Sequence, residues 1–159
     1  MTEQREASED VVMTRIGQAV MLLHAGDREE ARNRLGALWA ELGEAGDPLH
    51  RCTLAHYMAD TQDDPVDELV WDLRALSAAE GPAGERPAPP HGRIAVRGFR
   101  PSLHLNLAAD YLKLKRYGAA RDHLCRARAA CDALADDAYG EGVRAAIGRL
   151  ACRLEAADG

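Results

Sequence analysis

The sequence predicts an all-α fold, and two observations carry this prediction. Apolar residues recur every three or four positions over long stretches, which is the spacing of one face of an α-helix. Almost half of the 159 residues are apolar, yet aromatic residues are few and alanine is abundant. Such a composition favours helices over strands. The length fits one domain that can bury a core of its own.

The clearest helical pattern lies between Pro101 and Leu134. Its apolar residues form two sets with a break at Lys115 and Arg116. The first set is Leu103, Leu107, Tyr111 and Leu114, and the second is Tyr117, Ala120, Leu124, Ala127, Cys131 and Leu134. A break this short joins two antiparallel helices. Small residues stand where the two helices would touch most closely.

This stretch resembles a tetratricopeptide (TPR) repeat, a helix–turn–helix unit of 34 residues. Five positions match the motif when Pro101 is counted as the first, namely Ala108, Tyr111, Tyr117, Ala120 and Ala127. Lys115 stands in place of the family's usual turn glycine, and His104 occupies a position where the family has a large residue. The resemblance implies a right-handed superhelix of TPR-like helix pairs.

A first copy of the repeat is expected over about residues 12–46. A helix over about 8–25 ends at Gly26, the position of the turn glycine. Asp27 is predicted to be the N-cap of the second helix, and Glu30 three residues later completes a capping box.

A second copy is expected over about residues 49–80. Asp64 is predicted to cap its second helix, which has Pro65 in the first turn and acidic residues near the positive helix end. The acidic run DTQDDPVDE is therefore interpreted as a helix start, because it lacks the spacing and the glycine of an EF-hand calcium loop.

Residues 81–100 are predicted to interrupt the repeats. The part GPAGERPAPPHG is rich in proline and glycine and is interpreted as a linker, and RIAVRGFR follows it. In one interpretation Ile94, Val96 and Phe99 anchor this connection and the arginines are solvated. In the other, Arg93, Arg97 and Arg100 overhang the binding face and contact anions. The final helix, about 137–156, is predicted to cap the stack.

Charge and composition narrow the cellular setting. A net charge of −6 argues against nucleic-acid partners, since phosphates require a basic face. No apolar run reaches the length of a membrane span, and the N-terminus lacks the order of a signal peptide. A cytoplasmic protein is expected, with no membrane partner. Arginine far exceeds lysine and alanine is abundant, which favours a bacterial source of GC-rich genome.

No catalytic motif is present in the sequence, so the prediction is a protein that is not an enzyme and needs no cofactor. The four cysteines form no CxxC pair and are expected to be small buried residues. Cys52 and His56 are four residues apart, as a metal pair would be. The repeat alignment puts both, and His104, on the packed side of their helices. The expectation is therefore core residues and no structural metal.

In TPR proteins, the first helices of successive repeats line a concave groove. The resemblance places an apolar set from the first copy there, together with a polar set that comprises Thr53, Tyr57, Asp60, Ser102, Asn106 and Lys113, with Arg97 and Arg100 beside it. Asn106 coincides with a position where peptide-clamping TPR domains use asparagine. The family's basic clamp residues are absent from the first two copies.

The resemblance therefore implies a non-catalytic adaptor that binds a protein or peptide in its groove. An alternative function is a small-molecule-sensing helical-repeat module in which the 81–100 insertion acts as a lid. The oligomeric state, including a homodimer, stays open at this point.

Overall fold

The computed structural model describes residues 2–80 and 90–158. This part contains seven α-helices, a short 3-10 helix and no strand, which confirms the all-α prediction. The helices are α1 Thr2–His24, α2 Arg28–Leu42, α3 Pro48–Asp60, α4 Pro65–Glu80, α5 Pro90–Lys113, α6 Tyr117–Ala130 and α7 Ala138–Asp158, with the 3-10 helix η1 Cys131–Ala133. None of these described helices combines the length and the apolar character that crossing a bilayer requires.

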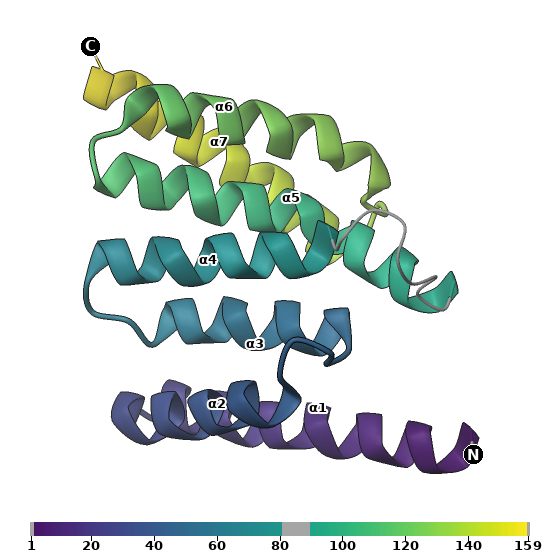
Figure 1. The fold of residues 1–159 in the computed structure, drawn as a ribbon. Helices are drawn as coiled ribbons and strands as arrows, with labels where there is room; N and C mark the ends of the chain where they lie inside the picture. Colours follow the sequence, from purple (N-terminus) through teal and green to yellow (C-terminus); the bar gives the residue numbers. More distant parts are fainter. Residues whose placement is uncertain (1, 81–89, 159) are drawn as a thin grey trace.

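The helices are stacked in chain order, and the two termini lie at opposite ends of the stack (Figure 1). Each helix packs against the next one along the chain. In addition, α1 contacts α3, α3 contacts α5, and α5 contacts α7. The odd-numbered helices therefore form one continuous layer, and any groove made by this layer receives side chains from several helices.

Three apolar clusters follow one another along the stack. The first joins α1, α2 and α3 through Ile16, Ala19, Leu35, Leu38, Leu54 and Met58. The second joins α3, α4 and α5 through Cys52, Ala55, Leu69, Ala75, Leu76, Leu103 and Leu107. The third joins α5, α6 and α7 through Ala108, Ala120, Leu124, Ala127, Leu134, Val143, Ile147, Leu150 and Leu154. Burial of these side chains provides the main driving force for stacking, and α3 and α5 each take part in two clusters.

The turns after α1 and α5 have the same backbone geometry. The N–H of Gly26 donates to the carbonyl of Leu23, and that of Lys115 donates to the carbonyl of Leu112. In both turns the following N–H reaches the carbonyl five residues back, which completes a Schellman motif. Gly26 has φ 92° and Lys115 has φ 58°. Lys115 thus adopts the left-handed conformation that a glycine usually provides.

The helix starts confirm most of the predicted caps. The side chain of Asp64 accepts a hydrogen bond from the N–H of Val66 at 2.7 Å, and Asp27 accepts one from Glu30 at 3.4 Å. The second hydrogen bond of the predicted capping box, from the N–H of Asp27 to the Glu30 carboxylate, is absent from the described structure. The Glu30 carboxylate instead accepts from Arg34 at 2.9 Å, and the N–H of Asp27 is already bonded to Leu22.

Helix α5 differs from the sequence prediction at its start. It begins at Pro90 and continues through Pro101, whereas the first helix of the third copy was expected to begin at Pro101. A proline inside a helix lacks its N–H and clashes with the preceding turn, which is why the sequence favoured a boundary there. The N-terminal part of α5 extends past the ends of α3 and α4 (Figure 1). The expected connection thus lies partly within a helix.

The expectation of buried cysteines is correct only for Cys52. Cys52 is buried, Cys131 is half-buried, and Cys125 and Cys152 are exposed. The exposed pair lies outside the apolar faces that α6 and α7 bury in the third cluster. Burial raises the pKa of the Cys52 thiol to about 12, so this thiol stays protonated at neutral pH.

Candidate functional site

The structure distributes the predicted groove residues over two helices. Thr53, Tyr57 and Asp60 come from α3, at a spacing that places them along one face. Ser102, Asn106 and Lys113 come from α5. The residues do not converge on one site. Thr53 and Tyr57 line an apolar cleft, Asp60 and Lys113 line a polar pocket, and Ser102 and Asn106 line neither.

The apolar cleft has a volume of about 350 Å³ and lies between α1, α3 and α5. Its lining consists of Met13, Ile16, Gly17, Val20, Leu49, Thr53, Tyr57 and Phe99. Phe99 and Met13 are 38% and 42% exposed, so two large apolar side chains face solvent at this cleft. Phe99 lies on the part of α5 that precedes Pro101. The unexpected extension of α5 therefore contributes directly to the cleft.

The polar pocket has a volume of about 380 Å³ and lies at the other end of α3. Its lining consists of Arg28, Ala59, Asp60, Gln62, Asp63, Glu68 and Lys113. Both cations of the pocket form ion pairs. Arg28 Nη2 is 3.2 Å from Asp63 Oδ1, and Lys113 Nζ is 2.9 Å from Glu68 Oε1. Asp60 makes no hydrogen bond or ion pair with a described residue. Burial raises the pKa of its carboxyl, and His56 opposes this rise.

The other predicted groove residues have partners elsewhere. Asn106 Nδ2 donates to His56 Nδ1 on α3 at 3.2 Å. The hydroxyl oxygen of Ser102 is 2.5 Å from that of Tyr139, which lies on α7. Arg100 points toward Glu80, with 3.9 Å between Nη2 and Oε1. The side chain of Arg97 lies outside the described residues.

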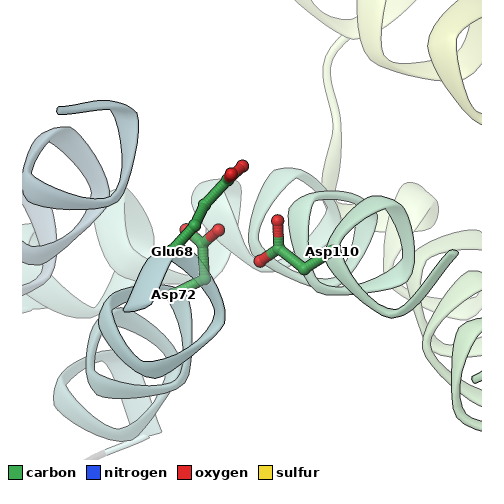
Figure 2. Close-up of side chains that lie close together, drawn as sticks. All are labelled: Glu68, Asp72 and Asp110. Atoms are coloured by element: carbon green, nitrogen blue, oxygen red, sulfur yellow. The ribbon is translucent and has the colours of Figure 1, made fainter. Parts of the chain in front are cut away.

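Three carboxyl groups meet between α4 and α5, next to the polar pocket. Glu68 and Asp72 are four residues apart on α4, and Asp110 faces them from α5 (Figure 2). One oxygen from each residue lies within 4.8 Å of the other two. Asp72 is 4% exposed and Asp110 is 1% exposed, whereas Glu68 is half-buried. We call these three residues the acidic cluster.

The acidic cluster is poorly compensated by its surroundings. Asp72 Oδ1 and Asp110 Oδ2 are buried and have no hydrogen-bond partner among the described residues. Burial, followed by the adjacent Asp72 and Glu68 carboxyls, raises the pKa of Asp110 to about 10. Burial raises the pKa of Asp72 to about 6, although Asp110 opposes this rise. Two ionised carboxylates cannot share this space without a proton or a cation between them.

Cys52, His56 and His104 make different contacts in the structure. Cys52 belongs to the apolar cluster between α3, α4 and α5. His56 is half-buried and bonded to Asn106. His104 is buried and shares a hydrogen bond with His123 on α6, with 3.1 Å between their Nδ1 atoms. The interpretation of Cys52 and His104 as core residues agrees with their burial.

Sequence reasoning missed the acidic cluster, although a signal for it exists. Asp72 lies within an apolar stripe, three residues after Leu69 and four before Leu76. Asp110 follows Leu107 by three residues in the same way. A charged residue inside an apolar stripe is rarely buried without a partner. Two such residues on helices that are consecutive in the chain indicate a paired polar site within the core.

The comparisons with protein-family models, curated proteins and solved structures found no match to this chain. The TPR resemblance thus stays a prediction from the sequence.

Proposed function

We propose that this chain is a non-catalytic, TPR-type protein-binding module. Its three helix pairs α1–α2, α3–α4 and α5–α6 form the repeats of a right-handed superhelix, and α7 caps the stack. The observation that supports this proposal best is the apolar cleft, because α1, α3 and α5 all contribute to it. These are the first helices of the three pairs, which line the binding face in the TPR arrangement.

The occupant is a peptide segment of a partner protein that carries a large apolar side chain and a nearby basic residue. The apolar side chain fits the cleft beside Met13, Tyr57 and Phe99, where it removes exposed apolar surface from water. Asp60 lies one helical turn after Tyr57 and makes no direct ion pair with a described residue. A lysine or arginine of the peptide would form such a pair, which gives the site both an anchor and an orientation.

A displayed random-peptide library with the full chain as bait tests this function. We expect selected peptides to share an aromatic or long aliphatic residue with a lysine or arginine close by. Met13→Glu should weaken their binding by at least about fivefold, because truncating or charging an anchor site costs about 1 kcal/mol or more. Tyr57→Ala should act in the same direction.

Met21→Glu is the matched control for this experiment. Met21 is on the same helix as Met13 and is 72% exposed, and it does not line the cleft. Both variants introduce the same charge at an exposed methionine of α1, so only a role of the cleft distinguishes them. Equal binding by the two variants, or a library that yields no consensus, would contradict the proposal.

A small-molecule-sensing module remains the second candidate, and one observation favours it. The volume of about 350 Å³ lies in the range of pockets that hold small ligands. Phe99, from the predicted 81–100 insertion, forms part of the wall. Native mass spectrometry of freshly purified protein decides between the two. A retained low-mass compound that is lost in Met13→Glu, with no peptide selected, would establish the sensor.

A further inference from the structure

The acidic cluster places carboxyl groups without compensating partners inside the stack. Asp72 Oδ1 and Asp110 Oδ2 have no hydrogen-bond partner among the described residues, and their side chains are almost fully buried. A buried, unpaired carboxylate is strongly unfavourable unless it is neutralised or paired. No cationic side chain among the described residues contacts these two atoms. Either a proton shared between Asp72 and Asp110 or a bound cation must therefore compensate them.

The spacing of the oxygens suits a metal ion. Glu68 and Asp72 project from the same face of α4, and Asp110 completes the group from α5 (Figure 2). Ca²⁺ binds oxygen at about 2.3–2.6 Å, so two ligands on opposite sides of the ion are about 5 Å apart at most. The three oxygens lie within 4.8 Å of one another and meet this limit. Mg²⁺, with shorter bonds, would require them to move closer.

Charge and access also suit a divalent ion. Three ionised carboxylates beside one lysine leave two negative charges for the ion to balance. Lys113 Nζ contacts both oxygens of Glu68, at 2.9 and 3.1 Å, and its side chain is 48% exposed. Glu68 and Lys113 both line the polar pocket, which provides an entry route and room for water ligands.

We propose that Glu68, Asp72 and Asp110 bind one oxygen-preferring divalent cation, Ca²⁺ or Mn²⁺, between α4 and α5. The ion bridges the second helix pair to the third and replaces the missing partners of Asp72 and Asp110. The site differs from the EF-hand loop that the sequence excludes, because two of its ligands lie within α4 and the third is on α5. It does not depend on the peptide-binding function.

The test is thermal unfolding of the full chain after treatment with chelator. We expect millimolar Ca²⁺ or Mn²⁺ to raise the melting temperature by about 5 °C or more relative to EDTA, as expected for saturation of a site on the folded state. Mg²⁺ should raise it less. Isothermal titration should give one site per chain.

Matched variants assign the effect to these residues. Asp110→Asn and Asp72→Asn keep the side-chain shape and remove a ligand charge, so each should abolish most of the shift. Asp67→Asn removes an exposed charge from the same helix and should leave the shift intact. Lys113→Met removes the cation that competes for Glu68 and should increase the affinity for Ca²⁺.

Two results would overturn the proposal. The first is a melting temperature that no divalent ion changes, together with a gain in stability in Asp110→Asn. This result would show that Asp72 and Asp110 share a proton instead. The second is an ion-dependent shift that persists in both asparagine variants, which would place the ion elsewhere. If one asparagine variant does not fold, the other asparagine variant and Lys113→Met still decide the question.

Discussion

Lys115 is the only described non-glycine residue with a positive φ. The left-handed region costs an L-residue about 1–2 kcal/mol relative to its favoured conformations, and Gly26 shows which residue the same turn accepts without this cost. We predict that Lys115→Gly stabilises the chain by about 1 kcal/mol, after the greater freedom of glycine in the unfolded state is subtracted. Chemical denaturation measures this change.

Lys115→Ala is the control for that prediction. Alanine removes the lysine side chain but keeps the Cβ atom that causes the strain, so the stability should stay close to that of the parent. A gain in Lys115→Ala as large as that in Lys115→Gly would assign the effect to the side chain and not to the backbone.

The hydrogen-bonded pair His104 and His123 makes stability sensitive to mild acid. Burial lowers the pKa of both imidazoles below that of an unfolded histidine, which titrates at about 6.5. The unfolded state then binds more protons, and stability falls as the pH drops below about 6.5. Charged groups face the pair from three helices, namely Glu80, Arg100, Asp122 and Arg126.

We predict that the double variant His104→Leu/His123→Leu loses less of its melting temperature than the parent between about pH 7 and about pH 5. Replacing both partners by apolar groups avoids leaving one of them unpaired. Carboxyl groups titrate in both proteins, and the comparison cancels their contribution. An equal loss in the two proteins would show that the histidine pair does not supply the acid sensitivity.

At the level of helices, the sequence predicted what depends on local periodicity. The faces of α5, α6 and α7 repeat apolar residues over several turns, and a single exception does not change the pattern. For the same reason the acidic cluster was missed, because Asp72 and Asp110 each occupy one position of an otherwise apolar stripe and do not change its period. Their proximity depends on how α4 packs against α5, and the pattern of either helix taken alone does not encode this relationship.

The predicted start of α5 was wrong for a related reason. Local rules place a proline in the first turn of a helix, and they correctly placed Pro65 there. Pro101 is inside α5 and fully buried, so its surroundings compensate a position that the local rule disfavours. The sequence offered Phe99 as an anchor of the connection, but its position in the cleft wall depends on this helical extension.

For the whole molecule, the serial arrangement of the three apolar clusters has a thermodynamic consequence. The first and third clusters share no helix. When each repeat contacts only the adjacent repeats, the stability of the stack is close to a sum of local terms along one dimension. A local loss of packing should therefore lower protection against unfolding mainly in its own part of the stack. Ile147 in the third cluster and Leu35 in the first offer buried positions for a symmetric comparison.

We predict that Ile147→Ala and Leu35→Ala each destabilise the chain by about 2–5 kcal/mol, since each removes a buried side chain. Hydrogen exchange should show where the loss occurs. In Ile147→Ala, amides of α6 and α7 should exchange faster while those of α1 and α2 keep most of their protection, and Leu35→Ala should show the reverse. Uniform loss of protection in both variants would mean that the helices unfold as one cooperative unit, in which α3 and α5 transmit every defect along the stack because each belongs to two clusters.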